Sequence, residues 1–185
     1  LHSCRIIPER GSWIELEVGK KDILTVRIDQ SGKLPATCFL RALSEEYTND
    51  EDIIRLFYET ETVKISDYSS ATKLRGRHTV EKIVNPQTGE IILEPGRPIS
   101  DTTIKAITDL EIKKIEVIKK LDDPLILNSL ESDFTKSHED ALLKFYVRFR
   151  PGNPQQLEKA KQLFYDKFFD AKRYRLGSVG RFRLN

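Results

Sequence analysis

The sequence has no methionine, only two cysteines and no long apolar run. Each of these features excludes certain classes of protein. Cys4 and Cys38 form no C-x-x-C pair, which excludes a disulfide framework and a zinc knuckle and favours a reducing compartment. No segment approaches the roughly 18 apolar residues that a membrane helix needs. No apolar N-terminal stretch resembles a signal peptide. The three histidines are too scattered to suggest a metal site.

The chain has 185 residues and begins with Leu1. Because translation starts at methionine, we expect a segment of a longer protein, or a chain whose N-terminus has been processed. The length suits one large domain, or one domain with a small insertion. Hydrophobic residues make up 38% and charged residues 32%, which is too apolar for global disorder.

Positive charge is concentrated at the C-terminal end. Residues 171–185 hold five basic residues and no acidic one, although the whole chain has a net charge of only +2. A mildly acidic body with a basic end favours binding of an anionic partner at one place. It does not suggest a surface that is basic throughout and binds nucleic acid everywhere.

The first third of the sequence predicts a small antiparallel sheet followed by two helices. Pro35 suits the first turn of a helix that runs to about Leu43. Asn49 or Asp50 can cap a second helix over 51–58. The predicted strands are short, apolar and separated by polar turns. They cover residues 4–8, 13–18 and 23–28.

The middle of the chain predicts an inserted β-β-α-β subdomain at about 61–122. Residues 67–78 are polar without a clear period. Strands 79–84 and 90–94 flank a turn that ends at Gly89, where a positive φ is expected. A helix that begins near Ser100 and a strand over 112–118 complete the subdomain.

The last third is predicted to be helical, with helices over 123–132, from Ser137 onward and over 155–169. The predicted fold class is therefore α+β, a small antiparallel sheet packed with several helices plus the inserted subdomain. The predicted domains are residues 1–60 with 123–185, and residues 61–122.

Catalytic signals are weak. The chain has no G-x-G-x-x-G or G-x-x-x-x-G-K-[ST] loop, no H-E-x-x-H and no G-x-S-x-G. The carboxylates at 50–52 are typical of a helix N-terminus. His138 is interpreted as a solvated or capping residue, and Cys38 as a small buried hydrophobe. We assign no catalytic residue and no metal ligand.

Aromatic and arginine side chains leave two interpretations open. Trp13 either covers the edge of the core, which the residues alone favour, or stacks on an unpaired base for roughly 1–3 kcal/mol. Arg150, Arg173 and Arg181 lie beside turns. They suit phosphate contact or an ordinary charged surface equally well.

Two ordered blocks of sequence resemble the lobe domain of the β subunit of bacterial DNA-directed RNA polymerase. They span about 1–58 and 123–185, and residues 61–122 more loosely resemble a module that many bacterial β subunits carry inserted here. The first block consists of residues 5–13 (RIIPERGSW), 26–29 (VRID), 33–37 (KLPAT) and 40–43 (LRAL). The second consists of residues 150–154 (RPGNP), 168–170 (FFD), 173–174 (RY) and 179–181 (VGR).

The resemblance implies that the chain forms one wall of the downstream DNA channel. This wall would face the clamp of the β′ subunit and help to hold the non-template strand. It assigns base stacking to Trp13, and the DNA-contacting residues are expected to be Trp13, Arg10, Arg150 and Arg173. Arg181 is implied less closely.

The resemblance also implies partners and a location. The expected partners are DNA, the β′, α, ω and sigma subunits, and transcription or repair factors, with no membrane. The expected location is the cytoplasm, at the bacterial nucleoid. The catalytic magnesium of this enzyme class is bound by β′, so no cofactor is expected in this chain.

Three departures from the family pattern affect charge or turn geometry. Residues 30–32 (QSG) stand where the family often has a basic triplet, which weakens the case for phosphate contact there. Asn153 and Gln155 replace the usual Glu and Pro of the Arg-Pro-Gly-Glu-Pro-Pro string. Arg175 replaces an acid after Arg173-Tyr174 and adds positive charge.

Two other functions remain as alternatives. The chain can be a docking platform for initiation or repair factors, with the edge strands 4–8 and 61–66 accepting a partner strand. A free-standing small enzyme has the least support, because no strongly perturbed carboxylate or histidine can be nominated.

Overall fold

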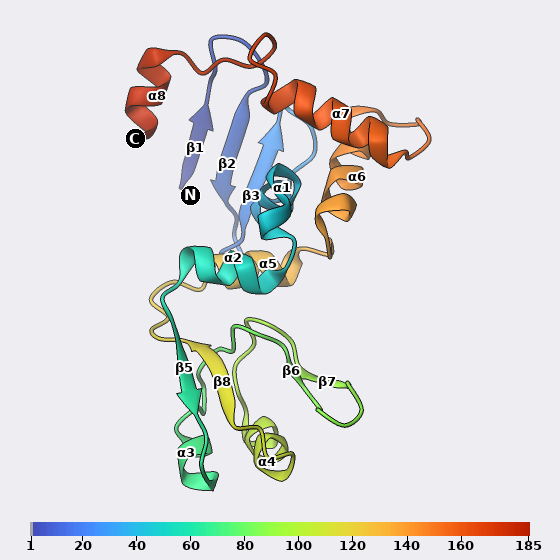
Figure 1. The fold of residues 1–185 in the computed structure, drawn as a ribbon. Helices are drawn as coiled ribbons and strands as arrows, with labels where there is room; N and C mark the ends of the chain where they lie inside the picture. The colour runs from blue at the N-terminus through green and yellow to red at the C-terminus, as the bar shows by residue number, and fades with distance from the viewer. Residues whose placement is uncertain (1) are drawn as a thin grey trace. The chain divides into compact units, whose positions relative to one another are not determined.

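In the computed structural model, which describes residues 2–185, the chain divides into two units (Figure 1). The first unit consists of residues 1–49 and 128–185, and the second of residues 50–127. Both combine helices with small antiparallel sheets, which confirms the α+β class. The assignment of residues 61–122 as an inserted subdomain stays a prediction.

The first unit contains a four-stranded antiparallel sheet of order β1-β2-β3-β4. Successive side chains point to opposite faces of a strand, so Ile14, Val26 and Ile28 are buried on one face of the sheet. The other face carries polar side chains, among them Glu15, which lies opposite Arg27 in the register. The strands are β1 (Ser3–Ile6), β2 (Ile14–Val18), β3 (Leu24–Ile28) and β4 (Leu34–Pro35).

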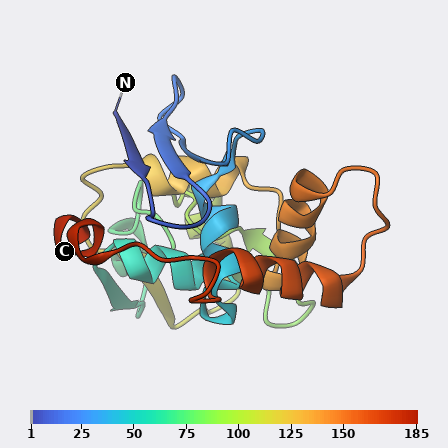
Figure 2. The same cartoon turned by 90° about the horizontal axis from the view of Figure 1, so that it is seen from above.

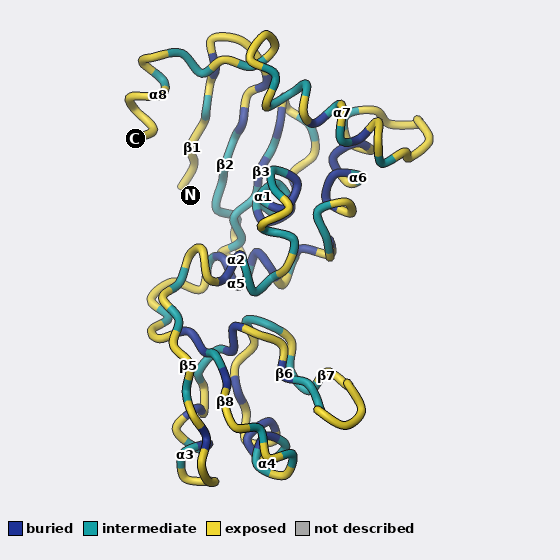
Figure 3. Tube along the Cα trace, in the orientation of Figure 1, coloured by how far each residue is buried: buried dark blue, intermediate teal, exposed yellow. Residues whose placement is uncertain are grey.

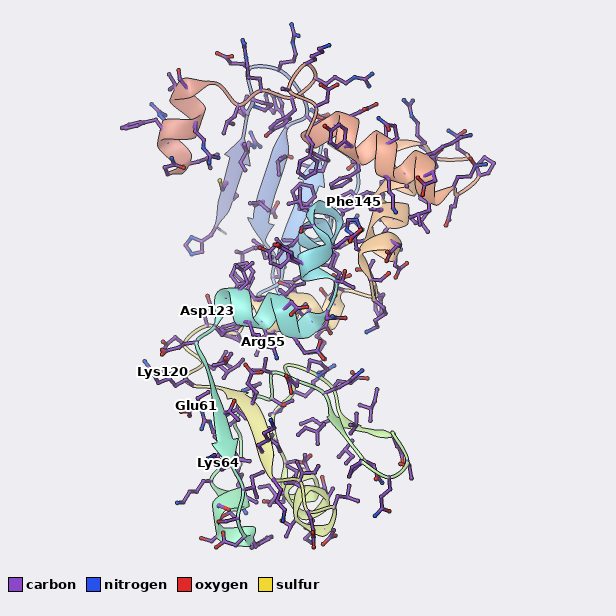
Figure 4. The ribbon with its side chains drawn as sticks, viewed as in Figure 1. Arg55, Glu61, Lys64, Lys120, Asp123 and Phe145 are labelled. Carbon is purple, nitrogen blue, oxygen red and sulfur yellow. The ribbon has the colours of Figure 1, made fainter. Side chains whose placement is uncertain are left out.

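Helices cover the apolar face of this sheet and supply an aromatic core. Phe39 of α1 packs edge-on against Phe145 of α6, which is labelled in Figure 4, at 5.6 Å between ring centroids. Phe145 meets Phe164 of α7 at 5.7 Å. Figure 3 shows this buried centre and the exposed α8. The helices are α1 (Ala36–Leu43), the 3-10 turn Glu45–Tyr47, α5 (Leu125–Ser132), α6 (His138–Phe149), α7 (Leu157–Phe168) and α8 (Ser178–Leu184).

A buried charge pair ties α1 to the loop that follows α5. Arg41 and Asp133 are 1% and 2% exposed at their side chains, and the guanidinium Nε lies 3.4 Å from the carboxylate. Thr37 and Thr135 donate hydroxyl hydrogen bonds of 2.7 and 2.6 Å to the same carboxylate. These bonds satisfy a carboxylate that would be costly to bury alone.

The second unit has a core of its own, in which Leu74, Ile104 and Val117 are fully buried. Strand β5 pairs with β8, and β6 pairs with β7. Arg55, labelled in Figure 4, lies 2.6 Å from both Glu116 and Glu81. The elements are α2 (Asp50–Phe57), β5 (Thr60–Lys64), α3 (Tyr68–Thr72), β6 (Ile83–Val84), β7 (Ile91–Leu93), α4 (Asp101–Asp109) and β8 (Lys114–Ile118).

Two helices were not expected from the sequence. Helix α3 lies within the polar stretch 67–78 and is nucleated by a capping box. The Asp67 carboxylate accepts from the Ser70 N–H at 2.8 Å, and the Ser70 hydroxyl accepts from the Asp67 N–H at 3.0 Å. Helix α8 buries no residue, and its apolar Val179 and Phe182 are exposed. The predicted strand 79–84 is reduced to β6, with Thr79 forming only an isolated bridge.

Candidate nucleic-acid interface

The turn between β1 and β2 carries Trp13, and its geometry depends on Gly11. Gly11 has a backbone φ of +118°, a conformation that residues with a side chain rarely adopt. A Cβ there would lie 2.7 Å from the Tyr174 ring and 3.0 Å from the Arg173 carbonyl oxygen. Glycine therefore lets the chain after α7 approach this turn closely.

Arg10 joins the turn between β1 and β2 to the segment that follows α7. Its N–H donates to the Arg175 carbonyl at 3.2 Å, and the Arg175 N–H donates back at 2.8 Å. The Arg10 guanidinium donates to the Lys172 carbonyl at 3.1 Å. Figure 2 shows the segment after α7 passing along the turn between β1 and β2. Arg10 thus has a structural role in joining residues far apart in the chain.

A polar network fixes the backbone at Trp13. The Trp13 N–H donates to Asp29 at 2.9 Å, and Lys167 of α7 reaches Asp29 at 2.8 Å and the Ser12 hydroxyl at 2.7 Å. Burial alone would raise the pKa of Asp29, but the hydrogen bonds from Lys167, Ser12 and Trp13 outweigh it and lower that pKa. Asp29 therefore stays ionised and holds the turn in place.

The indole of Trp13 is not sealed into the core, since the residue is 47% exposed. It lines a pocket of about 620 Å³ together with Arg5, Glu15, Arg27, Asp29 and Gln30. A half-exposed ring on a backbone held by hydrogen bonds can offer a flat face to a ligand without reorganising.

Arg150 and Arg173 line one neighbouring cleft of about 290 Å³. Arg173 is held by Asp166 at 2.9 Å and Asp170 at 3.5 Å. Among residues 2–185, the structure gives the Arg150 side chain no such carboxylate partner. The cleft is lined by Gly11, Ser12, Asp29, Arg150, Leu163, Asp166, Lys167 and Arg173.

Sequence comparisons place the chain in a known family. A family model described as RNA polymerase Rpb2, domain 2, matches residues 103–185. A DNA-directed RNA polymerase subunit beta from Rhodopirellula baltica is 52% identical over 189 residues, covering 100% of this chain and 15% of the relative. The corresponding subunit of Leptospira biflexa is 37% identical, covering 99% of the chain and 15% of the relative.

The chain belongs to the bacterial RNA polymerase β-subunit family. A DNA-directed RNA polymerase subunit beta from Geobacter sp. strain M21 is 34% identical over 242 residues, and the match covers 100% of this chain and 17% of that subunit. The chain spans about 15% of the length of the first relatives. The resemblance to the β-subunit lobe seen in the sequence is thereby confirmed.

Within this β-subunit segment, the five predicted DNA-contacting residues do not all come together. Arg150 and Arg173 share one cleft, and Trp13 lines the pocket beside it, with Ser12 and Asp29 between them. Arg10 lies at the same turn but is bonded to the tail. Arg181 lies on the exposed helix α8 and lines neither pocket.

Several residues of this surface were missed by sequence reasoning. Lys167 and Asp166 lie on the polar face of the predicted helix 155–169, where any charged residue is expected. Their partners Asp29 and Arg173 cannot be paired with them from spacing alone. Among residues 2–185, no group of three or more His, Cys, Asp or Glu side chains is placed to hold a metal ion. In the same range, no helix is long and apolar enough to cross a membrane.

Proposed function

We propose that this chain forms part of one wall of the downstream DNA channel of a bacterial RNA polymerase and contacts the non-template strand. The observation that carries this proposal is the half-exposed indole of Trp13 beside a cleft that holds Arg150, Arg173 and Lys167. An aromatic face accepts any unpaired base, and neighbouring cations neutralise phosphates. Such contact is tolerant of sequence, as a polymerase requires.

The chain's role is therefore one of binding and positioning. It takes part in nucleotidyl transfer as a piece of the assembled enzyme, with the other polymerase subunits and DNA as partners and the bacterial cytoplasm as its location.

The test uses the whole polymerase that contains this β segment. Trp13→Ala should weaken binding of the melted non-template strand. Two measurements report this change, the fluorescence of a 2-aminopurine placed in that strand and the lifetime of the open complex. Loss of one stacked base, worth about 1–3 kcal/mol, shortens that lifetime several-fold or more. Phe134→Ala is the matched control, because Phe134 is an 87% exposed aromatic outside both pockets. Equal behaviour of the two variants would contradict the proposal.

A second function is supported by the edge of the sheet. Strand β1 pairs only with β2 among the described residues, so its outer backbone groups can accept a strand from a protein factor. The Val18 N–H donates to the His2 carbonyl, so His2 and Cys4 face β2 in the ladder and the Ser3 N–H faces outward. Ser3→Pro would remove this outer donor. Factor binding that is insensitive to this change, in a folded variant, would reject strand addition at β1.

A further inference from the structure

The polar face of the first sheet carries a row of three charged side chains. Arg5 of β1, Glu15 of β2 and Arg27 of β3 are direct cross-strand neighbours. One carboxylate oxygen of Glu15 lies 2.8 Å from the Arg5 Nε in an ion pair, and the other accepts a hydrogen bond from the Arg27 Nε at 2.8 Å. A single carboxylate therefore orients two guanidinium groups.

This row is not neutral. Two arginines share one glutamate, which leaves one positive charge, and Glu15 is the most buried of the three at 16% side-chain exposure. The arginine side chains are 63% and 37% exposed. Both arginines contact Glu15 through Nε, and each guanidinium has two further nitrogen atoms that can donate. A guanidinium fork of this kind matches two oxygens of a phosphate.

The row lies beside the indole. Arg5, Glu15 and Arg27 line the pocket of about 620 Å³ that Trp13 also lines, and Gln30 adds an amide. The cleft with Arg150 and Arg173 adjoins this pocket, since Asp29 lines both of them. A base stacked on Trp13 would thus lie at a pocket lined by Arg5 and Arg27, next to a second pocket lined by Arg150 and Arg173.

We propose that the Arg5–Glu15–Arg27 row binds a backbone phosphate of single-stranded DNA next to the nucleotide that stacks on Trp13. This inference rests on the proposed function and extends the strand's path onto the polar face of the sheet. Glu15 is a positioning residue, which holds both guanidinium groups at the spacing of the strands. A purely structural role accounts poorly for the row, because an exposed cross-strand ion pair stabilises a sheet by less than about 1 kcal/mol and needs only one arginine.

The experiment measures the salt dependence of binding in the whole polymerase, with a fluorescent single-stranded thymidine oligomer as the probe. Arg5→Ala and Arg27→Ala should each lower the slope of log affinity against log salt by about 0.7, because each removes a phosphate contact. Arg27→Lys should keep the slope, since the charge remains. Arg75→Ala is the matched control, because Arg75 is an exposed arginine in a single ion pair with Asp101, outside this pocket.

The outcomes separate this inference from the proposed function. If Trp13→Ala and Arg150→Ala weaken binding while Arg27→Ala behaves like Arg75→Ala, the row is not a phosphate site and the proposed function stands. If none of these variants differs from the control, both fail. An equal loss of slope on a duplex of the same sequence would reject the single-strand assignment. A loss confined to binding of a protein factor would reassign the row to protein docking.

Discussion

Lys167 and Asp29, 138 positions apart in the chain, form an ion pair of 2.8 Å that joins α7 to the end of β3. The same carboxylate accepts the backbone N–H of Trp13. The orientation of the indole therefore depends on a charge pair outside its own turn. A helix whose sequence predicts only a core stripe thus also sets the geometry of the candidate DNA contact.

The first prediction concerns the pH dependence of this pair. The pKa of Asp29 is lowered in the folded chain, because its hydrogen bonds outweigh the effect of burial. A carboxyl whose pKa falls on folding stabilises the fold above its unfolded pKa of about 4, and this contribution is lost as the pH falls through the folded pKa. Urea denaturation from neutral pH into this acid range should show a smaller decline in unfolding free energy for Asp29→Asn than for the unmodified chain.

Asp122→Asn is the control for this measurement. Asp122 pairs with Lys120 at 2.6 Å, but both side chains are at least 72% exposed. Its removal should leave the acid dependence nearly unchanged. Parallel curves for Asp29→Asn and the unmodified chain would show that the Lys167–Asp29 contact contributes nothing to folding.

The second prediction concerns Gly11. Gly11→Ala should lower the unfolding free energy by about 2–4 kcal/mol, because a positive φ is combined with backbone and ring atoms within 3.2 Å of the new Cβ. Gly89→Ala is the matched control, since Gly89 has φ +73° with nothing within 4 Å of its Cβ, and should cost only about 1–2 kcal/mol. Equal losses in urea titrations would mean that the approach of Tyr174 to this turn is not tight.

The sequence predicted the elements that are defined by local chemistry. Ser100 caps α4 and Ser137 caps α6 as expected, and Pro35 lies at the N-cap of α1, one position before the first turn where it was expected. The alternation around Ile14 likewise predicted which face of β2 is buried. These signals depend on a few neighbouring residues, so no tertiary information is needed to interpret them.

The features that the sequence did not predict are two short helices and the contacts between distant residues. Helix α8 was missed because it is short, follows Gly177 and contains Gly180, and α3 was missed because its capping box lies in a polar stretch. The site was predicted only as far as the family resemblance extended. The cross-strand row of Arg5, Glu15 and Arg27 follows from strand register, which turn geometry and pairing determine and which composition does not reveal.

The third prediction concerns the two thiols. Burial, with Asp133 nearby, raises the pKa of Cys38 to about 12, so on the order of one molecule in ten thousand carries the thiolate at pH 8. Cys4 is exposed. Iodoacetamide should therefore label one thiol of the native chain and both in urea, as counted by mass spectrometry. Native Cys4→Ser should remain unlabelled over the same period, and rapid labelling of that variant would show that Cys38 is accessible.

The fourth prediction concerns the charge available to DNA in the cleft. Asp166 neutralises Arg173 at 2.9 Å, so a phosphate must compete with a carboxylate for that guanidinium. Asp166→Asn keeps the shape of the side chain, removes its charge and leaves Arg173 tied only to Asp170, at 3.5 Å. In the whole polymerase, this variant should bind the single-stranded oligomer more tightly and with a salt slope steeper by up to about 0.7. The double variant Asp166→Asn with Arg173→Ala should lose that gain. If it keeps the gain, the effect arises from net charge alone, and Arg173 does not contact the phosphate.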